Sequence, residues 1–293
     1  MPAPTTMPKT RWTPRTLTFL FIWWIGGLRP SILRFFVLGN LRNNLIKRGI
    51  LRGPAKHLAE VRADFERRAA GGQFQEHWFD RNIIPWCATF AKAFGRADSL
   101  RILEIGSWEG RSTLFFLTYF KHADLTAVDT WAGSEEWEYH ATGDLSDLEA
   151  RFDHNVGLGG GTVTKRKGSS LEVLPQLLSE NQTFDLIYVD GSHFADDALT
   201  DAINAWRLLR PQGIIIFDDV MWPAYARPRA NTAWAIHQFL KFHPGEYKVL
   251  HAAYQVILEK KTDFDDPLAE WVHRPAVPTS IRESAADAQR LPG

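Results

Sequence analysis

The sequence predicts an α/β protein built on a doubly wound, Rossmann-like sheet of seven strands, mostly parallel, with an antiparallel pair at its C-terminal end. Apolar segments of strand length alternate with amphipathic segments of helix length from residue 99 to residue 242, which is the pattern of βαβ units. Several apolar segments end in a carboxylate, and the carboxyl ends of parallel strands are where such sheets bind ligands. We expect a helical N-terminal extension (1–70), the sheet domain (71–260) and a tail (261–293).

The composition is that of an ordinary folded protein with one unusual region. The 293 residues hold 34 basic and 34 acidic side chains and suffice for one large core. Residues 1–70, however, carry thirteen Lys/Arg and only three Asp/Glu. The single cysteine, Cys87, excludes an internal disulfide and fits a reducing cytoplasm. Because it lies in an apolar run, we expect it to be a small core residue.

The N-terminal region is basic and apolar, and it has two interpretations. The uncharged run 17–28 is too short to cross a bilayer of about 30 Å, because Arg29-Pro30 ends it. Its aromatic residues and the surrounding cations suit a peripheral anchor on anionic lipid, formed by residues 11–52 of a cytoplasmic protein. They equally suit a helical arm that covers the protein's own core or a partner subunit in a homo-oligomer. The segment is too apolar for a nucleic-acid-binding arm.

A strand, a glycine-flanked turn and a helix form the first ligand-binding signal. Residues 99–105 predict a buried strand, and Gly106 and Gly110 bracket a turn. Ser112 and Thr113 then supply capping hydroxyls for a helix through residues 114–117. Glycine lets a ligand approach the backbone, and the helix N-terminus favours a carboxylate or phosphate.

The next strand, 125–129, ends in Asp129, which lies 23 residues after Gly106. An acid at this spacing can accept hydrogen bonds from both hydroxyls of a ribose, so the pair predicts a nucleoside cofactor. Two helices, 55–70 and 79–94, precede the first strand. In the second helix we expect Trp86 to be a core residue and Asn82 to be able to face the cofactor.

The middle of the chain predicts a cover and a third strand. The polar segment 132–161 suits either a roof over the pocket or a solvated loop with a short helix. A strand follows at 162–167, and after it Ser169 and Ser170 either border an adenine ring or simply cap the next helix.

Three aspartates follow two neighbouring strands. The strand 184–190 ends in Asp190, and after the helix 196–209 the strand 213–219 ends in Asp218 and Asp219. Carboxylates at adjacent strand tips converge and repel one another unless a cation lies between them. Oxygen ligands suit Mg²⁺ or Ca²⁺. Both Asp218 and Asp219 reach one ion only if the chain turns out of the sheet at Asp219.

His193, three residues after Asp190, is placed to take a proton from a substrate hydroxyl. Its alternative role is to cap the following helix or to pack on the sheet. The proline-rich, aromatic segment 220–231 predicts a second pocket wall, and a helix (232–242) and two antiparallel strands (247–251 and 254–259) complete the sheet. The candidate substrate contacts in that wall are Trp222, Tyr225, Arg227 and Arg229.

Five motifs together resemble class I S-adenosylmethionine-dependent O-methyltransferases of the small-molecule, cation-dependent type: L-E-I-G-S-W-E-G-R-S-T, A-V-D-T-W, K-G-S-S, F-D-L-I-Y-V-D-G-S-H and G-I-I-I-F-D-D. The resemblance covers residues 75–260 and implies methylation of a small-molecule or sugar hydroxyl. It implies Mg²⁺ ligation by Asp190, Asp218 and Asp219, with His193 and Asp190 catalytic. The cofactor would contact Glu104, Gly106, Ser107, Gly110, Ser112, Asp129, Thr130, Ser169, Ser170 and Asp190.

Two features depart from the family pattern. Trp108 replaces a middle glycine of the turn, and Asp219 stands where an amide is frequent.

Two other functions stay open from the sequence: a nicotinamide-dependent Rossmann oxidoreductase, and a non-catalytic, membrane-associated protein with a vestigial fold. The turn lacks the further glycines of the dinucleotide fingerprint, which argues against the first. A sugar, a phenol and a lipid-linked hydroxyl all suit the acceptor pocket.

Overall fold

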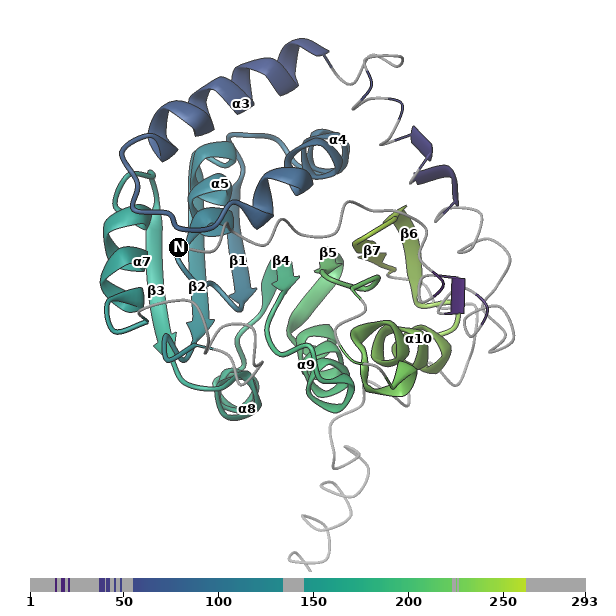
Figure 1. The fold of residues 1–293 in the computed structure, drawn as a ribbon. Coiled ribbons are helices and arrows are strands. Elements are labelled where there is room, and N and C mark those ends of the chain that lie inside the picture. The colour runs from purple at the N-terminus through teal and green to yellow at the C-terminus, as the bar shows by residue number, and fades with distance from the viewer. Residues whose placement is uncertain are drawn as a thin grey trace, which may run out of the picture.

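The computed structural model describes residues 55–133, 145–222, 225 and 227–261, with scattered positions between 14 and 48. One seven-stranded sheet, in the order β3-β2-β1-β4-β5-β7-β6, runs through this part of the chain (Figure 1). The strands β3, β2, β1, β4 and β5 are parallel to one another, and β7 is antiparallel to both β5 and β6. The predicted fold class is therefore confirmed.

The central strands form where the sequence has short apolar segments. β4 (Phe184–Val189) is buried along its whole length, as expected for a central parallel strand. The other strands are β1 (Ser99–Ile105), β2 (His122–Asp129), β3 (Thr162–Lys167), β5 (Leu209–Phe217), β6 (Tyr247–Ala252) and β7 (Val256–Lys260). The predicted strand 213–219 was wrong at both ends, because β5 starts earlier and stops before Asp218 and Asp219. Both aspartates therefore leave the sheet.

Helices cover both faces of the sheet (Figure 1). One face carries α3 (Ala55–Ala69), α4 (Ile83–Ala93), α5 (Arg111–Tyr119) and α7 (Leu148–Val156). The opposite face carries α8 (Ser170–Ser179), α9 (Ala195–Leu208) and α10 (Thr232–Phe242). Two separate hydrophobic clusters result, one on each side of the sheet. This is the doubly wound arrangement, and it leaves the carboxyl edge of the strands for loops.

The segment before α4 differs from the prediction in a way that shapes the site. The predicted helix 79–94 is in fact a 3-10 helix, η1 (Trp78–Asn82), followed by α4. Within α4, Trp86 and Cys87 are fully buried, which confirms the prediction that both are core residues. Burial raises the pKa of the Cys87 thiol to about 12, so the thiol is unreactive at neutral pH.

Three sequence predictions concern regions that the structure covers only in part. In the predicted roof, residues 134–144 lie outside the described residues, and α7 lies against α5. Most of the arm 11–52 and the tail 262–293 also lie outside them. Val61 and Phe65 of α3 belong to the hydrophobic core of the sheet domain. The helix that precedes the predicted domain boundary at residue 70 therefore packs on that domain. No helix among the described residues has the length and apolar character needed to span a membrane.

Candidate active site

A cavity of about 540 Å³ lies at the carboxyl edge of the sheet. Its volume is within the range of roughly 300–1,000 Å³ that is usual for small-molecule sites. The predicted site residues that line it are Gly106, Ser107, Ser112, Asp129, Thr130, Ser169, Ser170, Asp190, His193, Asp218 and Asp219. Glu104 and Gly110 are not among the lining residues. The topology thus brings together side chains that the sequence separates by more than a hundred positions.

The turn after β1 requires glycine at position 106. Gly106 has a φ of 82°, in the left-handed region, and a Cβ atom there would lie 1.9 Å from the carbonyl oxygen of Asp190. Its N–H donates to the carbonyl of Val128 at 2.9 Å. The turn therefore passes tightly between the ends of β2 and β4, and only a residue without a side chain fits.

Asp129 organises this turn from the end of β2. Its Oδ2 accepts hydrogen bonds from the backbone N–H groups of Ser107 and Trp108, both at 2.8 Å, and its Oδ1 accepts one from Trp131 at 2.7 Å. Burial raises the pKa of Asp129, although these backbone N–H groups oppose the shift. Asp129 lines the cavity, so the carboxylate predicted to bind the ribose is the one that already accepts the hydrogen bonds of the turn.

Glu104 lies behind the turn and is fully buried. It accepts hydrogen bonds from the hydroxyls of Ser112 and Thr113 in the first turn of α5. The prediction that these two residues cap the helix was wrong, because the N-cap position is Gly110, in the left-handed conformation. Glu104 instead fastens β1 to α5. Burial raises its pKa to about 7.

Ser169 and Ser170 line the cavity where α8 begins, at the side predicted for adenine. Ser169 is the N-cap residue, but its side chain makes no capping hydrogen bond. The Ser170 hydroxyl donates to Oδ2 of the buried Asp201 at 2.9 Å. Burial raises the pKa of Asp201 to about 7. The simple capping role predicted as an alternative for these serines is therefore not what their side chains do.

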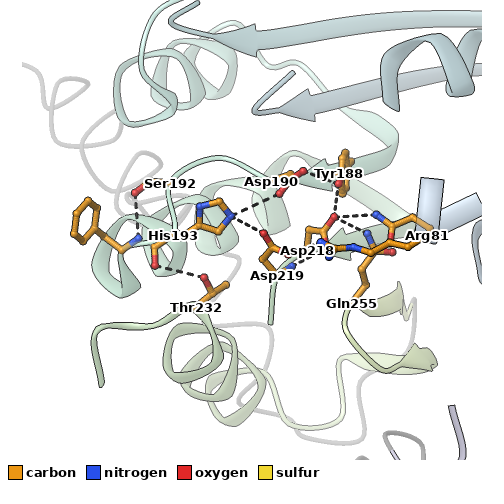
Figure 2. A network of polar contacts seen from close by, with 11 residues as sticks. Arg81, Tyr188, Asp190, Ser192, His193, Asp218, Asp219, Thr232 and Gln255 are labelled. Carbon is orange, nitrogen blue, oxygen red and sulfur yellow. Dashed lines mark hydrogen bonds and ion pairs between the residues drawn. The ribbon is translucent and has the colours of Figure 1, made fainter. Parts of the chain in front are cut away.

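The three aspartates meet at the tips of β4 and β5, as the sequence predicted (Figure 2). The hydroxyl of Tyr188, the penultimate residue of β4, is within hydrogen-bond distance of both Asp190, at 2.7 Å, and Asp218. Asp218 Oδ2 further accepts from Asn82 at 3.1 Å and from Gln255 at 2.7 Å. Burial raises the pKa of both Asp190 and Asp218, and their mutual repulsion adds to the shift of Asp190.

Asp219 turns out of the sheet, with a φ of 49°, and contacts the side chains of His193 and Arg81. Its Oδ2 lies 2.9 Å from His193 Nε2, and its Oδ1 accepts a hydrogen bond from Arg81 Nη2 at 2.8 Å. These neighbours lower the pKa of Asp219 although burial opposes the shift. Because a carboxylate only accepts, Nε2 is the protonated nitrogen of His193, and Nδ1 carries the lone pair in the neutral ring.

The predicted three-aspartate ligand set does not fit this geometry well. Among the described residues, the ligand atoms that lie within 4.8 Å of one another belong to Asp190, His193 and Asp219. Asp218 is outside that group, and its oxygens accept hydrogen bonds from three side chains and, at 2.7 Å, from the backbone N–H of Asp219. Asp219 Oδ1 also has a partner, because it accepts a hydrogen bond from Arg81.

The described residues of the segment 220–231 do not line the cavity, so the predicted second pocket wall is not found there. Trp222 lies against His193 with ring centroids 4.5 Å apart and an edge-to-face angle of 77°. Tyr225 stacks on Phe194 at 4.8 Å, and Phe194 lines the cavity. Arg229 instead lies over the ring of Trp234 in α10, at 5.2 Å. None of the four candidates of this segment is among the cavity-lining residues.

Sequence reasoning missed the residues that hold the aspartates from below and beside them. Arg81 comes from η1, and Gln255 and Tyr254 come from the turn between β6 and β7. No motif spacing links Arg81 to Asp219, which is 138 positions away. The one signal was W-F-D-R-N, a run of polar and aromatic residues just before an apolar helix, from which only Asn82 had been singled out.

Comparisons with known proteins match the same region. Residues 103–220 match the family model of a methyltransferase domain. The O-methyltransferase hkm8 of Aspergillus hancockii is 33% identical over 136 residues, which are 46% of this chain and 47% of that protein. An uncharacterized protein, R132 of Acanthamoeba polyphaga mimivirus, is 26% identical over 158 residues, covering 52% and 67%. This chain therefore spans about half the length of the fungal relative.

A solved structure of the MycE methyltransferase from the mycinamycin biosynthetic pathway, in complex with Mg and SAH, is 17% identical, with a TM-score of 0.47. The alignment covers 76% of this chain and 57% of that one. The family match confirms, for residues 103–220, the resemblance to methyltransferases that the sequence motifs indicated. All five motifs lie within this range.

Proposed function

We propose that the protein is an S-adenosylmethionine-dependent methyltransferase that methylates a hydroxyl oxygen of a small molecule. The observation that carries the proposal is that one cavity is lined both by the glycine turn, Asp129 and the α8 serines and by His193 and the aspartates. A nucleoside site and a proton acceptor thus share one space. The fungal O-methyltransferase that resembles this chain supports the same reaction class.

The cavity suits the parts of such a cofactor. The first turn of α5 reaches the cavity through Arg111 and Ser112, and helix N-termini favour a carboxylate. In this proposal the carboxylate of Asp129 accepts hydrogen bonds from the ribose hydroxyls and the start of α8 borders the base; the support is that both line the cavity. When bound, S-adenosylmethionine supplies an activated methyl group on a sulfonium, so the protein's contribution is alignment, water exclusion and proton removal.

His193 removes the proton in this proposal. The Nε2–H of the ring is held by Asp219 at 2.9 Å, and Trp222 limits the ring from one side. Both contacts fix the orientation of the imidazole. The lone pair on Nδ1 takes the proton of the substrate hydroxyl as the substrate oxygen attacks the methyl group. Asp219 then stabilises the imidazolium that forms. The acceptor class stays at the level of a hydroxyl on a sugar, a phenol or a lipid-linked compound.

Isothermal calorimetry with S-adenosylhomocysteine and, separately, NAD tests the cofactor. We expect binding of the first and none of the second; the reverse result would identify a nicotinamide enzyme. Incubation with radiolabelled S-adenosylmethionine and a cell extract then identifies the methylated product.

The proposed base is tested by His193→Ala. We expect it to lower the turnover number by about 10²–10⁴-fold and to leave S-adenosylhomocysteine affinity nearly unchanged. The exposed His122, at the start of β2 and outside the cavity, provides the matched control variant His122→Ala. Full turnover by the His193 variant would remove this residue from the mechanism.

A further inference from the structure

A permanent positive charge already lies against the aspartate cluster. Arg81 Nη2 is 2.8 Å from Asp219 Oδ1, and the side chain is 26% exposed. The carbon atom of its guanidinium group lies 4.0 Å from the centroid of the Tyr254 ring. Arginine does not lose its proton in proteins, so the charge persists at every pH at which the protein is folded. Figure 2 shows Arg81 on the side of the aspartates opposite His193.

The short helix η1 holds Arg81 in this position. Each of its other residues contacts a different part of the site or core, so the guanidinium is not on a freely moving surface side chain. Phe79 is buried in the core, Asp80 accepts two hydrogen bonds from Arg111 at 2.7 and 2.8 Å, and Asn82 donates to Asp218. The ring centroids of Trp78 and of Trp108, in the glycine turn, are 6.1 Å apart.

Asp190, His193 and Asp219 offer ligand atoms within 4.8 Å of one another, but both oxygens of Asp219 and of Asp218 are hydrogen-bonded to other groups. A hard divalent cation needs several oxygens whose lone pairs are available. Asp219 directs one oxygen to Arg81 and the other to His193, and Asp218 accepts hydrogen bonds from Tyr188, Asn82 and Gln255. The Arg81 guanidinium, bonded to Asp219, would also repel a divalent cation that binds the same carboxylate.

We propose that the Arg81 guanidinium supplies the positive charge that this carboxylate cluster requires and excludes a divalent cation from it, so that Asp219 acts on His193 and not on a metal. Arg81 is thereby a positioning residue for the base. The catalytic consequence rests on the methyltransferase function proposed above, whereas the exclusion of a cation does not depend on it. Turnover is accordingly expected to be the same with and without EDTA.

Electron paramagnetic resonance of Mn²⁺ tests the exclusion directly, because the signal of free Mn²⁺ falls when the ion binds. The full-length chain is titrated as wild type, Arg81→Met, Arg81→Lys and Arg62→Met. Arg62 lies on the exposed side of α3 and pairs with Glu66, so its loss removes one charge far from the cavity. We expect only Arg81→Met to bind one equivalent of Mn²⁺, at least about tenfold more tightly than wild type. Adding Asp219→Asn to that variant should abolish the binding.

Two results would overturn the proposal. The first is stoichiometric Mn²⁺ binding by the wild type that Asp219→Asn removes, and the second is a folded Arg81→Met variant that binds no more Mn²⁺ than wild type. Circular dichroism establishes folding. If Arg81→Met does not fold, Arg81→Gln replaces it, and if neither folds, the wild type and Arg81→Lys decide: absence of binding by both supports the proposal, and binding overturns it. Calorimetry with S-adenosylhomocysteine on the same samples separates failure of the proposed function from failure of the exclusion.

Discussion

Glu104 offers a quantitative test of how the cofactor turn is built. Its carboxyl is fully buried between β1 and α5 and accepts hydrogen bonds from the hydroxyls of Ser112 and Thr113. Burial disfavours the ionised form more strongly than the two hydroxyls favour it, so the pKa rises from 4.5 to about 7. Replacing Glu104 with glutamine keeps the shape and one acceptor while removing the ionisation.

The expected magnitude follows from linkage between protonation and folding. Between pH 4.5 and about 7, the folded protein keeps the Glu104 proton that the unfolded chain has lost. The free energy of unfolding therefore falls as the pH rises through this window. At 1.36 kcal/mol for each pKa unit, the total loss is about 3 kcal/mol, of which roughly 2.5 kcal/mol falls between pH 5 and pH 8.

Urea unfolding at pH 5 and pH 8 measures the effect. We expect Glu104→Gln to lose less stability than wild type between these pH values, by about 2.5 kcal/mol. Other titrating groups cancel in this double difference. Glu60 is exposed on α3, and Glu60→Gln is the matched control variant. A double difference near zero, or one of opposite sign, would show that the two hydroxyls stabilise ionised Glu104 enough to outweigh its burial.

Three further predictions concern the turn, the aspartate cluster and the N-terminal arm. Gly106→Ala should destabilise the fold by about 3 kcal/mol or more and abolish S-adenosylhomocysteine binding in calorimetry, because its Cβ would meet the Asp190 carbonyl at 1.9 Å. Gly160→Ala, whose Cβ meets nothing within 4 Å, is the control and should fold normally. Tyr188→Phe leaves Asp190 and Asp218 without their shared donor, so urea unfolding should show a loss of about 1–3 kcal/mol; an unchanged midpoint would contradict the bridging role. If residues 11–52 form a peripheral anchor, the full-length protein should float with phosphatidylglycerol vesicles at low salt and not with phosphatidylcholine vesicles, and equal behaviour with both would favour the protein-covering arm.

The local pattern of residues determined most of the fold and the position of the site. Apolar runs predicted the central strands β1, β4 and β5, because a strand buried on both faces needs no polar side chains. The placement of Asp129, Asp190 and Asp218 at the ends of such runs predicted one ligand-binding edge, since parallel strands end on the same side. The alternation of side chains along a strand gave a turn at Asp219 only as the condition under which Asp218 and Asp219 reach one ion, and the structure shows that turn.

Only the tertiary structure decided how those carboxylates are used. Whether Asp219 binds a metal, a histidine or an arginine depends on Arg81, which reaches it from η1 across 138 positions. The same holds for Gln255 beneath Asp218 and for the two hydroxyls on Glu104. Sequence periodicity reports which side chains are buried, but a hydrogen bond depends on direction and on distances of about 3 Å. Such geometry arises only when separate elements are packed together, so the partners of a buried charge belong to the folded chain.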